Sequence, residues 1–158
     1  MTRIYIEDAG KHVGEEVTLW GWLHQKRSSG KIQFLMIRDG TGYIQGVLVK
    51  NAVSPEIFAA ADALTHESSL KVTGKVREDA RAPSGYEMDL TNVEVVQAVP
   101  KEDPFPITPK EHGIDFLMDY RHLWIRSTRQ RAILKVRHEI IKARSEEHTS
   151  ELQSLAYL

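Results

Sequence analysis

The sequence contains no cysteine, no long apolar run and almost no net charge. Without cysteine, a disulfide scaffold, a cysteine-ligated zinc site and a thiol nucleophile are excluded. Lys and Arg number 21 against 22 Asp and Glu, which excludes a polycationic, histone-like binder but leaves room for a local basic patch. No run approaches the roughly 20 apolar residues of a membrane-spanning helix, and the N-terminus lacks the apolar segment of a signal peptide. We therefore expect no membrane span and a cytoplasmic location.

The first hundred residues are rich in strand-like patterns. Five apolar or alternating runs bounded by turn residues predict β-strands at 17–27, 31–39, 43–50, 70–77 and 86–96. A single helix is predicted at 54–64, with Ser54 as its N-cap and Pro55 at its first position. In the last run the apolar phase slips, which predicts a β-bulge near Thr91 and Asn92. Five strands with a helix between the third and fourth follow the order of the OB-fold. We therefore predict a mainly β domain over 1–100, a Greek-key barrel of the kind that binds oligonucleotides.

The residues after position 100 have no strand-like pattern and contain a proline-rich stretch followed by a helical pattern. Prolines crowd the stretch VPKEDPFPITP, so 101–126 is predicted to be an extended linker. Ser127 and Gln130 have the spacing of a capping box, and apolar residues recur after them at helical intervals, which predicts a basic amphipathic helix over 127–143. The string RSEEHTSELQS that follows resembles an in-frame translation of a common short-read sequencing adapter. We therefore expect 144–158 to be a non-native tail.

Candidate binding residues lie on the predicted second and third strands. Phe34 and Gln45 point outward if their neighbours face the barrel interior, namely Leu35, Ile37, Ile44 and Leu48. Lys26 and Arg27 end the first strand nearby. An exposed aromatic ring, an amide and two cations are the parts of a single-strand site, in which the ring stacks a base, the amide reads an edge and the cations meet phosphates. The alternative is that Phe34 packs under a loop and Gln45 is a solvated strand residue.

Other polar features are less specific. Lys71, Lys75 and Arg77 share one face of a predicted strand, where they could follow an RNA backbone or simply be solvated. The seven histidines contain no HExxH motif, so no metal ligand is nominated.

The segment GWLHQKR…IQFLMIRDGTGYIQGVLV resembles the N-terminal anticodon-binding domain of class IIb aminoacyl-tRNA synthetases, whose tRNAs share a middle U in the anticodon. The resemblance implies that Phe34 stacks on that U, that Gln45 reads its edge, and that Arg27 is the basic residue at the strand end. Lys26 stands where the family often has a further arginine. Glu78, with the loop after it, is implied to reach the first anticodon base.

The stretch FPITPKEHGIDFLMDYRHLWIRSTRQRAILKVRHEI is similar to the linker and first catalytic-domain helix of asparaginyl-tRNA synthetases, and the run RHLWIRS differs from the RYLDLR-like run of aspartyl enzymes. The resemblance implies a homodimeric asparagine–tRNA ligase that uses ATP and Mg²⁺. The chain holds neither the F-R-x-E core of motif 2 nor motif 3, so no catalytic, cofactor or metal residue is nominated. We expect it to bind tRNA without catalysing the reaction.

Three other interpretations remain at this point. The chain could come from an aspartyl-tRNA synthetase, or from one that charges both tRNAs. It could be a free-standing OB module that binds single strands without sequence preference. It could also be a structural module with no nucleic-acid role, in which case it would show no salt-sensitive RNA binding.

Overall fold

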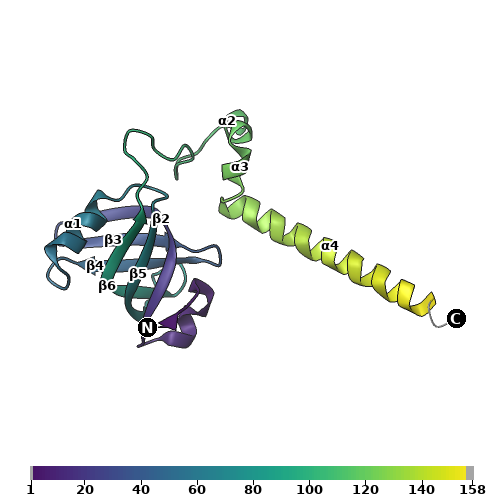
Figure 1. Ribbon diagram of the computed structural model, residues 1–158, viewed down its shortest axis with the longest axis horizontal. Helices are drawn as coiled ribbons and strands as arrows, with labels where there is room; N and C mark the ends of the chain where they lie inside the picture. The colour runs from purple at the N-terminus through teal and green to yellow at the C-terminus, as the bar shows by residue number, and fades with distance from the viewer. Residues whose placement is uncertain (1, 156–158) are drawn as a thin grey trace. The chain divides into compact units, whose positions relative to one another are not determined.

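The structure is a computed structural model that describes the backbone of residues 2–155 and the side chains of residues 2–146. It divides the chain into two compact units, Met1–Pro109 and Lys110–Leu158 (Figure 1). Each unit is described by itself below.

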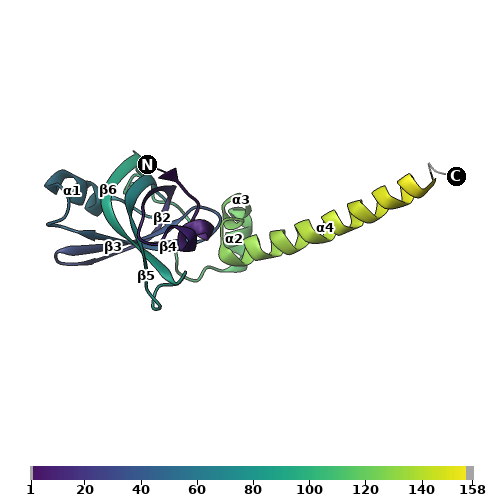
Figure 2. The same ribbon diagram turned by 90° about the horizontal axis from the view of Figure 1, so that it is seen from below.

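The first unit is a closed β-barrel, which confirms the predicted fold class. Its elements are β1 (Thr2–Arg3), η1 (Ile6–His12), β2 (Glu16–Ser29), β3 (Ile32–Arg38), β4 (Tyr43–Val49), α1 (Pro55–Ala63), β5 (Ser69–Glu78) and β6 (Tyr86–Gln97). The long strand β2 pairs antiparallel with both β3 and β5, and the parallel pairing of β4 with β6 completes the closure. Only the short β1 and the helix η1 were absent from the prediction. The helix α1 contacts β6 and lies at one end of the barrel (Figure 2).

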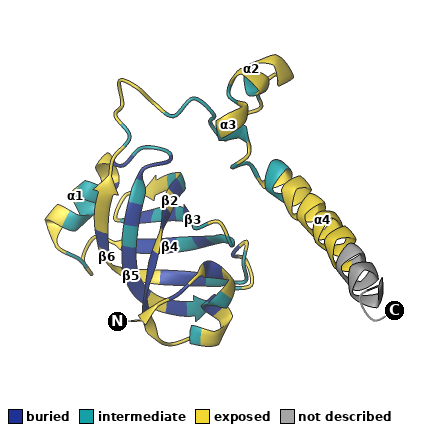
Figure 3. Cartoon of the chain, turned by 45° about the vertical axis from the view of Figure 1, so that its right-hand side comes forward, coloured by how far each residue is buried: buried dark blue, intermediate teal, exposed yellow. Residues whose placement is uncertain are grey.

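The barrel core is formed by the residues that the alternation placed inward. Leu35, Ile37, Ile44 and Leu48 are fully buried, and Leu70, Val72 and Val76 of β5 are buried with them. Burial of each large side chain contributes about 1.5–3 kcal/mol to folding before entropy is counted. The buried residues follow the strands of this unit, as the dark segments of Figure 3 show.

Two β-bulges interrupt the middle of the sheet, and a third register shift lies near the end of β6, between Val95 and Gln97. Thr73 pairs with Asn92 while Gly74 pairs with Leu90, so Thr91 is the extra residue and the predicted bulge is confirmed. A Cβ on Gly74 would collide with the carbonyl oxygen of Asp89, which explains why glycine stands at this position. The second bulge was not predicted. Leu23 pairs with Ile37 and Gln25 with Met36, so His24 is unpaired.

The bulge at His24 reverses which side chains of β2 face outward. Before it, Trp20 and Trp22 are exposed while Leu23 is buried. After it, Gln25 and Arg27 take the outer face, and the alternate residue Lys26 pairs with the buried Leu35. A bulge inserts one residue and so shifts a period of two by one position.

The second unit is helical. It contains α2 (Ile114–Asp119), α3 (Arg121–Trp124) and α4 (Thr128–Leu155). The two short helices lie inside the segment 101–126 that was predicted as an extended linker, and they begin after the last of its prolines, Pro109. The backbone N–H of Gln130 donates to Ser127 Oγ at 3.3 Å, so the predicted cap starts α4.

The helix α4 runs past 143 into the predicted tail, because Glu, Leu, Ala and Arg favour helix and neither glycine nor proline interrupts them. Its backbone conformation does not bear on the origin of 144–158, of which 156–158 lie outside the described residues. Within the described part of the chain, no helix has the length and apolar character needed to cross a bilayer.

Candidate nucleic-acid interface

Arg27 and Phe34 form the centre of the outer face made by β2, β3 and β4. They are direct partners across the β2–β3 ladder, and the Arg27 guanidinium carbon lies 4.8 Å from the centroid of the Phe34 ring. The Phe34 ring is half-buried, whereas the Arg27 side chain is exposed and lies over the ring. Aromatic faces and guanidinium planes are the two surfaces on which unpaired bases stack in RNA complexes.

Gln45 lies beside this pair with its amide already oriented. It is the cross-strand partner of Met36, and its Nε2 donates to Glu87 Oε1 at 2.6 Å. Among the described residues the amide oxygen and the second N–H have no other partner. An acceptor next to a donor complements the edge of uracil, where an N–H stands between two carbonyl oxygens.

An ion-pair network holds Glu87 in place. Its carboxylate is 7% exposed and pairs with Arg77. Arg77 also lies 3.1 Å from Asp89 and 3.6 Å from Asp79. Hydrogen bonds and the opposite charges of these carboxylates raise the pKa of Arg77 against the lowering effect of its partial burial. Arg77 thereby compensates the negative charge of Glu87. The Glu87 carboxylate in turn accepts the hydrogen bond that fixes the orientation of the Gln45 amide.

The structure brings together three of the five predicted site residues. Arg27, Phe34 and Gln45 line one cavity of about 130 Å³, the Phe34 hollow, together with Gln25 and Met36. The same three residues border a second cavity of about 370 Å³, the Arg81 hollow, which extends to Asp79 and Arg81 in the loop between β5 and β6. Their grouping supports the predicted roles, which stay predictions.

Lys26 and Glu78 do not join this group. Lys26 turns to the other side of β2 and its Nζ donates to the Asp62 carbonyl in the last turn of α1, which satisfies a free helix end. Burial lowers the pKa of Lys26, although the charge of Asp62 opposes this. Glu78 is exposed at the end of β5 and lines neither the Phe34 hollow nor the Arg81 hollow. The neighbouring loop residues Asp79 and Arg81 take the place expected for it.

Sequence reasoning missed Glu87 and placed Arg77 on a solvated or RNA-facing cationic strand. The alternation of β6 was sufficient to put Glu87 outward, because Met88 and Leu90 are buried. The alternation could not show that Gln45 pairs with Glu87, because these two residues lie 42 positions apart in the sequence, on two parallel strands. No local pattern encodes such a contact.

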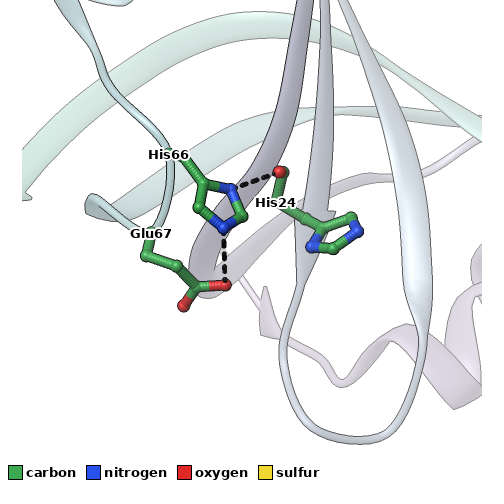
Figure 4. Close-up of side chains that lie close together, drawn as sticks. All are labelled: His24, His66 and Glu67. Atoms are coloured by element: carbon green, nitrogen blue, oxygen red, sulfur yellow. Dashed lines mark hydrogen bonds and ion pairs between the residues drawn. The ribbon is translucent and has the colours of Figure 1, made fainter. Parts of the chain in front are cut away.

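A cluster of His24, His66 and Glu67 lies on the same unit (Figure 4). Its three side chains have the composition of a metal site, but their contacts do not suit one. His66 Nδ1 lies 2.6 Å from the His24 carbonyl oxygen and Nε2 lies 3.1 Å from that of Ile107. Both oxygens of Glu67 accept from Arg38 Nη2, at 3.0 and 2.8 Å. The cluster therefore ties the segment at Ile107 to the barrel, and the ligand atoms of His66 and Glu67 are already engaged.

Protonation of His24 should destabilise the barrel. Partial burial lowers the pKa of His24 below its ordinary value of 6.5, the charges of His66 and Arg38 lower it further, and Glu67 opposes them. The unfolded chain then binds this proton more readily than the folded one. Stability should therefore fall as the pH drops through 6.5 towards the folded-state pKa. Urea unfolding above and below this pH, compared with His24→Gln, measures the effect. Equal losses in both proteins would assign it to other groups.

The family profile described as an OB-fold nucleic acid binding domain matches residues 17–96, half of the chain. The chain belongs to this family. It is similar to an asparagine–tRNA ligase of Koribacter versatilis, with 59% identity over 141 residues that make up 89% of the chain and 32% of the relative. The OB-fold chain therefore spans about a third of the length of the curated relative it matches.

Two solved structures share the architecture of this OB-fold chain. Asparaginyl-tRNA synthetase from Pyrococcus horikoshii, complexed with asparaginyl-adenylate, has a TM-score of 0.82 at 40% identity over 92% of the chain and 34% of that structure. Aspartyl-tRNA synthetase from Entamoeba histolytica has a TM-score of 0.83 at 20% identity over 96% of the chain and 38% of that structure, a likeness that shows the fold alone.

Proposed function

We propose that this chain is the anticodon-binding part of an asparagine–tRNA ligase and that it binds tRNA through the outer face of β2, β3 and β4. One observation carries the proposal. A stacking ring, a cation and an oriented amide meet in the Phe34 hollow of a chain that is 59% identical to such a ligase. The aspartyl alternative has the support of fold likeness alone, at 20% identity.

In the proposed complex the middle anticodon base, a U, stacks on Phe34. Gln45 accepts the N–H of uracil through its amide oxygen and donates its remaining N–H to a neighbouring carbonyl, while Glu87 prevents the amide from turning over. Arg27, whose guanidinium lies beside the Phe34 ring, contacts the phosphate. The contribution of Lys26 is indirect, since it secures α1 rather than facing the base.

We place the catalytic chemistry of the intact ligase in the part of its length that this chain does not cover. We propose a homodimeric class II enzyme of the cytoplasm in which ATP and Mg²⁺ activate asparagine before its transfer to tRNA. The side chains described here do not fit Mg²⁺, which prefers open oxygen ligands, because the carboxylate of the His24 cluster is held by Arg38. We assign no catalytic role to this chain and expect it to be inactive alone.

A fluorescence titration of the full chain with anticodon stem-loops tests the proposal. The GUU loop should bind more tightly than the same loop with a middle C by about 1–3 kcal/mol, the range for losing a specific base contact. The difference should persist from low to moderate salt. Equal binding of both loops, with both removed by salt, would instead describe a generic cationic OB surface and would overturn the proposal.

A further inference from the structure

Two polar side chains lie behind the pair formed by Arg27 and Phe34. On β2 the neighbour of Arg27 is Lys26. On β3 the neighbour of Phe34 is Gln33. Side chains of neighbouring strand residues point to opposite faces, so Lys26 and Gln33 lie on the side of the sheet away from the proposed RNA face. Both make their polar contacts with α1.

Asp62 is the residue of α1 at which these two side chains meet. Gln33 Nε2 donates to Asp62 Oδ1 at 3.3 Å and to the Phe58 carbonyl oxygen at 3.3 Å. Lys26 Nζ donates to the Asp62 carbonyl oxygen and lies 3.9 Å from Asp62 Oδ1. One aspartate thus contacts a residue of β2 and a residue of β3. We name Lys26, Gln33 and Asp62 the α1 clamp.

The helix α1 can serve as an anchor because apolar contacts of its own fix it to the barrel. Ala61 and the C-terminal cap residue Leu64 are buried in the core, and Ile57 and Phe58 pack against it. Ser54 Oγ accepts from the backbone N–H of Ile57 at 3.3 Å and so caps the first turn. The α1 clamp therefore joins the β2–β3 hairpin to an element that has independent support.

The part of the hairpin that carries Arg27 and Phe34 needs such support. Their pair stands two positions before the last pair of the β2–β3 ladder, Ser29 with Ile32. In the described sheet this part of β2 pairs with β3 alone, because the ladder of β2 with β5 ends at Trp22. The end of a two-stranded hairpin opens at a lower free energy than the centre of a sheet. The α1 clamp opposes this opening from the side of the core.

Gln33 itself is poorly suited to stabilise the barrel. Its side chain is fully buried, and its Oε1 has no hydrogen-bond partner among the described residues. Turning the amide over would place Oε1 against the oxygens of Phe58 and Asp62, so the orientation stands. A buried acceptor without a partner costs free energy that an apolar side chain would not. The amide therefore indicates a role besides folding.

We propose that the three residues of the α1 clamp are positioning residues for tRNA binding and hold Arg27 and Phe34 in the orientation that receives a base. The inference rests on the proposed function, because it presupposes that a base stacks on Phe34. A surface that is ordered before binding loses less conformational entropy when it binds. The α1 clamp should act on affinity and not on base choice, since Gln45 stands on β4 and is held separately by Glu87.

Gln33→Met separates positioning from folding. The variant keeps an unbranched side chain of similar size and removes the unpartnered oxygen, and water replaces the lost donor at the exposed Asp62, so the midpoint of urea unfolding should stay the same or rise. Fluorescence titration with the GUU stem-loop should nevertheless show binding weakened by about 2–12-fold, the range for immobilising one side chain, with the preference for a middle U unchanged. Thr73→Val is the matched control. It makes the same change from a buried polar to an apolar side chain on β5 and should leave binding unchanged.

A double-mutant cycle shows whether the α1 clamp acts through the stacking ring. In a Phe34→Ala background Gln33→Met should cost less than about 2-fold, because no ring is left to orient. Asp62→Ala, at an exposed position that folding tolerates, should weaken binding as Gln33→Met does. Asp62→Asn keeps the Oδ1 acceptor for Gln33 and should restore most of the affinity.

The outcomes separate this inference from the proposed function. If Phe34→Ala and a middle C both weaken binding but Gln33→Met and Asp62→Ala do not, the inference is overturned and the anticodon proposal stands. A full cost of Gln33→Met in the Phe34→Ala background, or a loss of affinity that only follows a fall in the unfolding midpoint, also overturns it. If neither Phe34→Ala nor a middle C weakens binding, both proposals fail.

Discussion

Alanine at Phe34 should weaken binding of the GUU stem-loop by about 5–150-fold, because stacking on one aromatic ring contributes about 1–3 kcal/mol per base. The substitution also removes the surface on which the Arg27 guanidinium rests. Phe34→Tyr keeps a ring at the same position and should retain most of the affinity. Fluorescence titration of the three proteins at one salt concentration measures the difference.

Gln45→Ala should reduce the discrimination between a middle U and a middle C more than it reduces the overall affinity for the stem-loop. The amide is the one polar group of the Phe34 hollow whose orientation is fixed from outside, by Glu87 at 2.6 Å. Its loss should reduce the preference for a middle U over a middle C by about 1–3 kcal/mol. Lys26→Ala is the matched control, since Lys26 neighbours Arg27 in sequence but contacts Asp62 on the other side of β2. A loss of discrimination in Lys26→Ala equal to that in Gln45→Ala would contradict this division of roles.

Much of this site could be predicted because it depends on alternation. A period of two determined that Leu35 and Ile44 face the core, and with them that Phe34 and Gln45 face outward. The prediction lost accuracy where the period is broken. The bulge at His24 has no glycine to mark it, so the outward aim of that histidine could not be read from the sequence.

Contacts between elements that are distant in the sequence set the second limit on what the sequence could predict. Gln45 meets Glu87 only because β4 and β6 run parallel, and Lys26 meets Asp62 only because α1 closes one end of the barrel. The proline-rich segment has no regular structure up to Pro109, but the influence of its prolines does not extend to 114–124 in the second unit. There α2 starts after Gly113 without a side-chain cap, so no capping signal announced it.

Arg38→Ala should have the largest effect on stability. The Arg38 and Glu67 side chains are 9% and 5% exposed, and the guanidinium donates to both carboxylate oxygens. Removing one partner of a buried ion pair leaves the other charge buried without its counter-ion and costs about 3–5 kcal/mol. The affected Glu67 has a φ of 65°, a left-handed conformation that is costly for a glutamate, and the ion pair is one of the contacts that maintain it.

Urea unfolding of two further variants distinguishes a buried charge from a lost contact. Lys71→Ala breaks an ion pair of similar length, 2.9 Å, but its partner Glu94 is 56% exposed, so we expect a cost of about 0.2–1 kcal/mol. Arg38→Met combined with Glu67→Gln keeps most of the side-chain volume and leaves no buried charge, so this double variant should be more stable than Arg38→Ala. If it is instead the less stable of the two, the ion pair itself, rather than the penalty for a buried carboxylate that has lost its arginine, holds the loop of Glu67 on the barrel. The same loop carries His66, whose ring is bound to the Ile107 carbonyl. Detachment of this loop would therefore also release the segment around Ile107 from the barrel.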